Sequence, residues 1–335
     1  DGVAGTTEVV PSWAPVAARI REATDDWSDT AAADRFEGKG GTLVRGAGKL
    51  VAADTVVVGD RRYRARSAVV VATGTSPSIP PIDGLDATPF WTNRDAVRAT
   101  ELPDSLIVLG GGAIGVELAQ VFARFGVEVT VAEAADRLVP NEDPAAGTLL
   151  AEVFADDGIE VVTGIRATRV AHEAGRFTVI LDDDRTLDAD RLLVATGRQV
   201  DLGAIGAESI GVDPSARALE IDGRCRVTDG VWAVGDVTGM GMFTHVAIWQ
   251  GRIAAADILD RDRDHLGAAD DAAVPRVTFT DPEIGSVGLS EADARERGID
   301  VAVGTADLSE SGRGTTHGVG NDGLIKLVAD RDRGL

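Results

Sequence analysis

The feature that most constrains the fold is a 20-residue block that occurs twice in the chain. Residues 55–74 read TVVVGDRRYRARSAVVVATG, residues 178–197 read TVILDDDRTLDADRLLVATG, and the two blocks align without a gap. Each block predicts an apolar strand, a charged turn, a short return strand and a second apolar strand that ends in Ala-Thr-Gly. Because an internal repeat reflects repeated architecture, we expect two domains of similar design.

A glycine-rich loop precedes the second block. Residues 110–115 read GGGAIG, follow a predicted strand over 105–109 and open a predicted helix over 114–125. This order of strand, loop and helix is the context that a dinucleotide-binding fingerprint requires. A matching loop for the first block would lie before Asp1, so we expect the chain to start inside a domain.

The fingerprint gives each glycine of this loop a task. The first permits a tight turn, the third lets the backbone approach a pyrophosphate, and the last allows the helix to pack closely on the strand. The helix start adds free N–H groups and the positive end of the helix dipole, which favour phosphate binding. The segment predicted to hold the phosphates is Gly110, Gly111, Gly112, Ala113, Ile114 and Gly115.

An acidic residue stands where this fingerprint places a ribose ligand. Glu133 ends the next predicted strand, 23 residues after Gly110. A carboxylate there binds an adenosine ribose hydroxyl and repels a 2′-phosphate. The sequence therefore favours NAD(H) over NADP(H).

Two further acids have less specific surroundings. Glu117 lies just inside the predicted helix, where spacing alone favours a solvated acid stabilised by the helix dipole. Asp236 follows the apolar run VWAV and precedes a Gly-rich loop and a helix. Its position suits equally a carboxylate that accepts hydrogen bonds from a polyol and an ordinary turn residue.

Composition excludes several classes of function. The 335-residue chain has a net charge of −22 and a pI of about 4.5, which argues against nucleic-acid partners and anionic membranes. Its single cysteine, Cys225, is predicted to be a small buried residue, and the count fits a reducing, cytoplasmic compartment. The histidines show no metal-ligand spacing, so no metal site is expected; they are His172, His245, His265 and His317.

The remaining elements follow from periodicity and from the positions of glycine and proline. The region after residue 274 has a β-rich texture around one predicted helix, 291–297, and reads as a separate α+β domain. The other predicted elements are helices over 14–36, 144–157 and 244–259, strands over 41–50, 127–132 and 159–163, and a Pro-rich linker over 74–84.

The order of the motifs resembles a known family, the pyridine nucleotide–disulfide oxidoreductase flavoproteins, and within it the branch around dihydrolipoamide dehydrogenase and mercuric reductase. The matching motifs span nearly the whole chain. They are RGAGK (45–49), VVVATGTSPSIPPIDG (69–84), ELPDSLIVLGGGAIGVELA (101–119), VTVAEAADRLVP (129–140), LLVATGR (192–198), VWAVGDVTG (231–239) and FTDPEIGSVGLS (279–290).

This resemblance implies an α/β fold with two Rossmann-like domains, one for FAD and one for NAD, and part of an α+β dimerisation domain. The FAD domain is expected to be incomplete. The implied segments are 1–92 and 217–272 for the FAD domain, 93–216 for the NAD domain and 273–335 for the interface domain.

The resemblance also implies roles for particular residues. On the FAD side, it matches Gly48, Thr73, Gly74, Thr75, Asp236, Met242, Phe243, Thr244 and His245. On the NAD side, besides the glycine loop and Glu133, it matches Ala167, Ala195, Thr196, Gly197 and Arg198. Glu117 matches a flavin-proximal acid that pairs with a lysine in relatives, and is the one catalytic candidate in the chain.

The departures from the family pattern are equally specific. The sequence has no first GxGxxG for FAD, no redox-active CxxxxC and no C-terminal His–Glu pair. We therefore expect a segment of a longer enzyme, inactive by itself, whose complete form is a homodimer that moves hydride between NAD(H) and FAD and exchanges electrons with a lipoyl-type or other dithiol or disulfide substrate. Two alternatives stay open: a disulfide-free flavin reductase that acts on a metal ion, quinone or oxygen, and a non-catalytic NAD-binding module.

Overall fold

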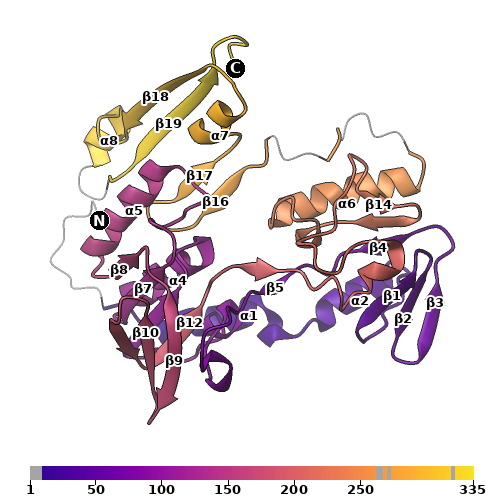
Figure 1. Ribbon diagram of the computed structural model, residues 1–335, viewed down its shortest axis with the longest axis horizontal. Coiled ribbons are helices and arrows are strands. Elements are labelled where there is room, and N and C mark those ends of the chain that lie inside the picture. Colours follow the sequence, from indigo (N-terminus) through magenta and orange to yellow (C-terminus); the bar gives the residue numbers. More distant parts are fainter. Residues whose placement is uncertain (1–9, 262–266, 270–272, 318–320) are drawn as a thin grey trace. The chain divides into compact units, whose positions relative to one another are not determined.

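The structure, a computed structural model, describes residues 10–261, 267–269, 273–317 and 321–335 (Figure 1). The chain forms two compact units. The first unit comprises Asp1–Asp26, Pro77–Gly197 and Pro275–Leu335, and the second comprises Trp27–Ser76 and Arg198–Val274. The chain changes unit inside the predicted linker 74–84 and directly after the second Ala-Thr-Gly. The domain limits expected at residues 92, 216 and 272 stay predictions.

The first unit is built on a four-stranded parallel sheet in the order β12-β6-β7-β8. All five residues of β6, the run SLIVL, are buried, because a parallel strand in this setting is covered on both faces. Helices link β6 to β7 and β7 to β8. The elements are β6 (Ser105–Leu109), α4 (Ala113–Arg124), β7 (Glu128–Glu133), α5 (Pro144–Asp156), β8 (Glu160–Thr163) and β12 (Arg191–Val194).

The side chains of β6 divide the core of this unit into two layers. Leu106 and Val108 face α4 and α5, where Phe122 and Phe154 are fully buried. The alternate residues of β6 face an antiparallel three-stranded meander, where Phe177 is fully buried. The meander consists of β9 (Ala167–Glu173), β10 (Arg176–Leu181) and β11 (Thr186–Ala189).

The repeated block folds in the same way in both units. In the second block, β10 and β11 form a hairpin, and β12 then joins β6 in parallel. In the first block, β2 and β3 form a hairpin, and β4 then joins β15 in parallel. The repeat is thus confirmed as a hairpin followed by a strand of a parallel pair, with Ala-Thr-Gly at the end of that strand.

The second unit contains two three-stranded sheets, ordered β1-β2-β3 and β14-β15-β4. All four residues of the outer strand β3 are exposed. The strand predicted over 41–50 begins only at Gly48, after a turn at Gly46, whose φ is +144°. The elements are β1 (Gly48–Ala52), β2 (Thr55–Val58), β3 (Arg61–Arg64), β4 (Val69–Val71), β14 (Arg226–Thr228), β15 (Val231–Ala233) and α6 (Thr244–Ile258).

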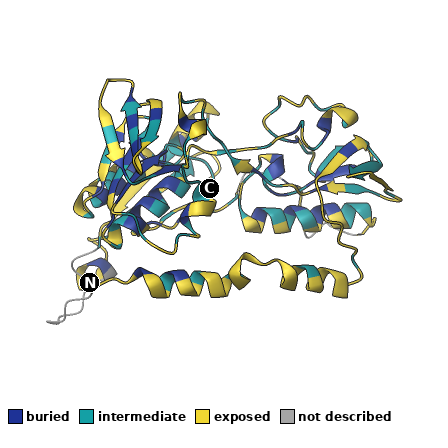
Figure 2. Cartoon of the chain, turned by 90° about the horizontal axis from the view of Figure 1, so that it is seen from below, coloured by how far each residue is buried: buried dark blue, intermediate teal, exposed yellow. Residues whose placement is uncertain are grey.

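The helix predicted over 14–36 is interrupted. It forms α1 (Trp13–Ala23) and α2 (Thr30–Gly38), separated by Asp25–Trp27, whose φ angles are all positive. Both helices are largely exposed (Figure 2), so little apolar burial holds them in one piece. Trp13 and Ala17 are the buried residues of α1. The indole N–H of Trp13 donates to the carbonyl of Ala99 at 3.0 Å, and its ring lies 5.7 Å from that of Phe122.

The C-terminal part of the first unit has two antiparallel pairs of strands, β16 with β17 and β18 with β19. Its second helix, α8, was not predicted, because SGRGTTH with two glycines reads as a loop. The elements are β16 (Arg276–Thr278), β17 (Ile284–Ser286), α7 (Glu291–Glu296), β18 (Val301–Asp307), α8 (Gly312–His317) and β19 (Leu324–Asp330).

Short elements complete the chain. The two-residue strands β5 and β13 pair with each other. Across the described ranges, no helix combines the length and apolarity that crossing a lipid bilayer requires. The short elements are β5 (Ser76–Pro77), η1 (Asp25–Trp27), η2 (Leu85–Ala87), α3 (Asn93–Ala96), β13 (Arg198–Gln199), η3 (Ala207–Ile210) and η4 (Asp236–Thr238).

Candidate functional site

The glycine loop lies between β6 and α4, and packing accounts for two of its glycines. Gly110 has φ +109°, and a Cβ there would lie 2.5 Å from the carbonyl oxygen of Ala195. A Cβ at Gly115 would collide with the carbonyl oxygen of Gly110. Around Gly112, by contrast, no described atom comes within 4 Å of a Cβ position. The loop is therefore tight on its protein side and open at the N-cap of α4.

The sheet order places this loop at a topological switch point. From β6 the chain continues to β7 on one side, whereas β12 lies on its other side. In open α/β sheets, ligands bind in the crevice at the carboxyl ends of such diverging strands. Gly110 and Ala195 meet there, and Thr196 and Gly197 follow, both exposed. The predicted residues Ala113 and Ile114 form the first turn of α4, whose N–H groups point toward the same crevice.

Glu133 braces the glycine loop from the end of β7. One carboxylate oxygen accepts the N–H of Gly111 at 2.5 Å, and the other accepts the N–H of Ala135 at 2.6 Å. Its backbone carbonyl accepts the N–H of Ile165 at 3.1 Å, two residues before Ala167 begins β9. Glu133 thus links the glycine loop by hydrogen bonds to the segment that leads to Ala167, which was also predicted on the NAD side.

Glu117 contacts the C-terminal part of the first unit. Its carboxylate accepts the backbone N–H of Phe279 at 2.8 Å. One turn further along α4, the side chain of Gln120, which is 4% exposed, exchanges hydrogen bonds with the backbone of Asp281 at 2.7 and 2.9 Å. Sequence reasoning missed Gln120; the available signal was a polar side chain beside the apolar stripe of the helix.

In the second unit, three predicted residues meet in a polar network. Arg198 donates from Nε to the hydroxyl of Thr75 at 2.6 Å and from Nη2 to its carbonyl at 2.9 Å. The Thr75 hydroxyl donates to Oδ2 of Asp236 at 3.1 Å. The Arg198 side chain is directed to Thr75 and Asp236, which were predicted on the FAD side, whereas Arg198 itself was predicted among the NAD contacts.

A buried amide fixes the loop that carries Asp236. Gln250 on α6 is fully buried; its Oε1 accepts the N–H of Gly235 at 2.7 Å, and its Nε2 donates to the hydroxyl of Thr238 at 3.2 Å. A buried amide that makes several bonds holds its partners in place, because leaving any of them unpaired is costly. Gln250 was also missed, although it shares a helix face with Val246 and Ile253.

The other predicted FAD-side residues are more dispersed within the second unit. Gly48 begins β1, opposite Val58. Thr73 and Gly74 follow β4, with Gly74 at φ +67°. The start of α6 presents the segment Met242, Phe243, Thr244 and His245, in which the rings of Phe243 and His245 stack at 5.4 Å.

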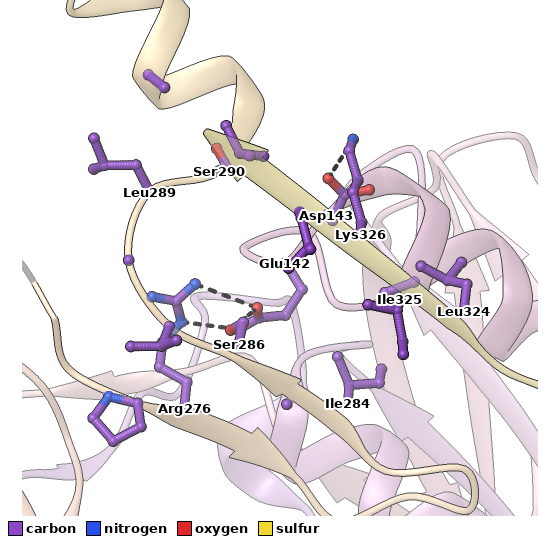
Figure 3. A pocket seen from close by; sticks show the side chains of 18 of the residues that line it. Glu142, Asp143, Arg276, Ile284, Ser286, Leu289, Ser290, Leu324, Ile325 and Lys326 are labelled. Carbon is purple, nitrogen blue, oxygen red and sulfur yellow. Dashed lines mark hydrogen bonds and ion pairs between the residues drawn. The ribbon is translucent and has the colours of Figure 1, made fainter. Parts of the chain in front are cut away.

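A cavity of about 800 Å³ lies in the first unit between the start of α5 and the C-terminal strands (Figure 3). Inside it, Glu142 accepts hydrogen bonds from Ser286 at 2.6 Å and from Arg276 at 3.2 Å. The predicted cofactor residues are not among its described lining. The cavity is therefore a feature of the C-terminal segment and not of the dinucleotide crevice.

Lys326 joins two carboxylates beside this cavity. Its ammonium lies 2.7 Å from Asp143, the N-cap of α5, and 3.0 Å from Glu291 on α7. Burial raises the pKa of Asp143, but the hydrogen bonds from Lys326 and the Ala145 N–H outweigh it and leave that pKa below its usual value. The hydrogen bond to Asp143 raises the pKa of Lys326. The pairing therefore ties β19 to α5 at neutral pH.

Cys225 is fully buried, and burial together with Asp222 and Asp257 raises the pKa of its thiol to about 12. Because the thiolate is the reactive form, we expect no labelling of Cys225 by a thiol reagent at pH 8 in the folded protein and full labelling in urea, measured by peptide mass spectrometry. Because the pKa of this thiol is higher in the folded chain than in the unfolded chain, its neutral form stabilises the folded state. This contribution to stability is complete below a pH of about 9 and is lost as the pH rises toward 12. Rapid labelling of the native protein would contradict the burial.

Metal binding finds no support among the described residues, which contain no group of three or more His, Cys, Asp or Glu side chains suited to hold an ion. His265 lies outside the described residues. The residues predicted to bind cofactors thus form two separate candidate regions, one within each unit.

Comparison with known proteins points to the family that the motifs indicated. A family model described as pyridine nucleotide-disulphide oxidoreductase matches residues 14–251, and the dimerisation domain of the same family matches residues 274–335. These matches confirm the predicted α/β fold class with a C-terminal dimerisation segment.

Individual relatives agree with the family models. Dihydrolipoyl dehydrogenase from Halobacterium salinarum is 35% identical over 273 residues, and mercuric reductase from Streptomyces lividans is 37% identical over 272 residues; each alignment covers 79% of this chain and 56% of the relative. The structure of HOCl-induced flavoprotein disulfide reductase RclA from Escherichia coli superposes with a TM-score of 0.83 at 27% identity, covering 96% of this chain and 74% of that chain. The chain thus spans little more than half the length of these curated relatives.

Proposed function

Because this chain belongs to the pyridine nucleotide-disulphide oxidoreductase family, we propose that the full-length protein moves hydride between NAD(H) and FAD and passes electrons to a dithiol or disulfide substrate. The observation that carries the proposal is the loop Gly110–Gly115. It is tight where Gly110 and Gly115 meet backbone and open at Gly112, on the N-terminus of a helix at a switch point. That is the cradle that a dinucleotide pyrophosphate needs.

The residues present fit NAD in the first unit and part of FAD in the second unit. In the first unit, the N–H groups of α4 bind the pyrophosphate, and Glu133 accepts a ribose hydroxyl at the end of β7. In the second unit, Asp236 accepts a hydroxyl of the flavin's polyol chain. Thr75 bonds to the carboxylate of Asp236, and Gln250 bonds to Gly235 and Thr238 in the same turn. The 335 residues do not contain the first GxGxxG with which the family holds the FAD diphosphate.

The cofactors supply the redox chemistry, and the protein supplies binding, orientation and exclusion of water. The preference for NADH follows from Glu133, whose negative charge repels a 2′-phosphate. Glu117 is the candidate for the flavin-proximal acid. Its hydrogen bond from the N–H of Phe279 also holds the start of the dimerisation segment against α4.

The proposal extends to assembly and location. The match of residues 274–335 to a dimerisation domain supports a homodimer. The acidic composition and single cysteine support a cytoplasmic protein without nucleic-acid or membrane partners. The 335 residues by themselves are expected to be inactive, because they contain neither the redox cysteine pair nor the C-terminal His–Glu pair of the family.

The test is anaerobic titration of the purified full-length protein with NADH and, separately, NADPH, followed by visible absorbance. We expect a flavin spectrum that NADH bleaches at lower concentration than NADPH. A long-wavelength charge-transfer band on reduction indicates a cysteine pair beside the flavin, and bleaching without that band favours the disulfide-free reductase. A protein without flavin would leave only the NAD-binding module.

A further inference from the structure

We infer that Arg198 is a positioning residue for Asp236: it acts through the hydroxyl of Thr75 to hold the carboxylate that binds the polyol chain of FAD. This inference rests on the proposed function and assigns Arg198 to the FAD side. The three residues lie in the second unit, so the network is complete within one compact body.

The repeat brings Thr75 and Arg198 together. When the two blocks are aligned, each residue directly follows its own Ala-Thr-Gly, so Thr75 and Arg198 occupy equivalent positions. The strands that leave the blocks, β5 and β13, pair with each other. An arginine at the second position can therefore reach both the side chain and the backbone of its counterpart.

The direction of each hydrogen bond is fixed by chemistry. A guanidinium can only donate, so the Thr75 hydroxyl accepts from Nε of Arg198 and directs its own hydrogen to Asp236. A second bond, from Nη2 to the Thr75 carbonyl at 2.9 Å, makes the contact a fork that holds the threonine in orientation. Thr75 is 9% exposed, so water competes little for these bonds.

Electrostatic attraction between Arg198 and Asp236 supports the same placement of the carboxylate as the hydrogen bonds do. Nε of Arg198 lies 3.9 Å from Oδ2 of Asp236, with side chains 21% and 26% exposed. Within the described residues, the recorded partners of the Asp236 carboxylate all lie at Oδ2. Thr75 and Arg198 therefore hold Oδ2, which leaves the accepting capacity of Oδ1 for a hydroxyl of the proposed ligand.

The turn that carries Asp236 is also held by α6, so the contribution of Arg198 can be measured separately. Gly235 and Thr238 are bonded to the buried Gln250. Removing Arg198 therefore leaves the backbone of the turn in place and frees only the side chains of Thr75 and Asp236. The expected consequence is a change in cofactor affinity and flavin environment, with little change in stability.

The test compares variants of the full-length protein by FAD titration of the apoprotein, monitored by flavin fluorescence and by the visible spectrum of the bound flavin. We expect Arg198→Met to raise the Kd for FAD by about 10- to 100-fold, the range for losing a charge-assisted hydrogen bond, and to shift the flavin absorption bands. Arg217→Met removes the same charge from an exposed position in the same unit and is expected to match the wild type.

A double-variant cycle distinguishes action through Thr75 from an independent effect. Thr75→Val removes the hydroxyl, and Thr75→Ser keeps it. If Arg198 acts chiefly through that hydroxyl, the loss of FAD affinity in Arg198→Met combined with Thr75→Val is clearly smaller than the product of the two single losses, and Thr75→Ser stays close to the wild type. Multiplying effects in the double variant would overturn the inference.

Each failure is distinguishable. If the wild type binds no FAD, the proposed function and the inference both fall. If the wild type binds FAD and Arg198→Met binds it equally well with an unchanged flavin spectrum, only the inference falls. Should Arg198→Met not fold, as judged by circular dichroism, the comparison of Thr75→Val with Thr75→Ser decides: equal affinities overturn the role of the hydroxyl.

Discussion

Replacing Gly115 with alanine is expected to destabilise the first unit by about 3 kcal/mol and to remove dinucleotide binding with it, since overpacking against a fixed neighbour costs on that order. The methyl group would collide with the carbonyl oxygen of Gly110, a backbone atom that cannot turn aside. Urea unfolding of the full-length protein measures the loss of stability, and calorimetric titration with NADH measures the loss of binding.

Gly112→Ala is the matched control, because position 112 has room for a Cβ atom and position 115 does not. Gly112 has φ −76° and ψ 179°, which alanine adopts freely, and the space around it is open. We therefore expect wild-type stability and strongly weakened NADH binding, because the new methyl group enters the space meant for the pyrophosphate. Wild-type NADH affinity in Gly112→Ala would refute the assignment of the loop, and unchanged stability in Gly115→Ala would refute its packing.

Glu133→Gln is expected to weaken NADH binding by about 10- to 100-fold, the range for hydrogen bonds that involve a charged group. Both carboxylate oxygens accept backbone N–H groups, at 2.5 and 2.6 Å. A glutamine amide has one accepting atom, so one of these bonds is lost and the brace on Gly111 loosens. The lost charge also removes the repulsion of a 2′-phosphate, so the preference for NADH over NADPH is expected to shrink.

The control for this variant lies at the other end of the same strand. Glu128 begins β7, is exposed, and differs from Glu133 in having no recorded side-chain hydrogen bond within the described chain. Glu128→Gln is expected to keep wild-type affinity for both nucleotides, measured by the same calorimetric titrations. Equal effects of the two substitutions would point to a loss of overall charge and not to a site at Glu133.

The sequence predicted the elements whose patterns are local and strong. The apolar run 105–109, the glycines that follow it and the paired blocks required no knowledge of the tertiary structure, because periodicity and glycine spacing carry the information. The break at Asp25–Trp27 was not predicted, because a polar helix with little buried surface shows no pattern that ends at a particular residue.

Side-chain contacts across long sequence separations were not predicted. Gln120 bonds to Asp281, and Arg198 bonds to Thr75, partners more than a hundred residues apart in each case. Nothing local distinguishes such an amide or guanidinium from one that is solvated. Resemblance to a family placed Arg198 among the backbone contacts to NAD but assigned its side chain no partner.

The outer strand β3 has a consequence for how the chain behaves during synthesis. Its residues Arg61, Arg62, Tyr63 and Arg64 are all exposed, and among the described strands β2 alone pairs with it. An open strand edge is a template on which other chains aggregate, and positive charges along it discourage that pairing. Three arginines in four residues give this edge a like-charge repulsion against a second copy of itself, so the β1-β2-β3 sheet is protected from edge-to-edge association while neighbouring segments are still being made.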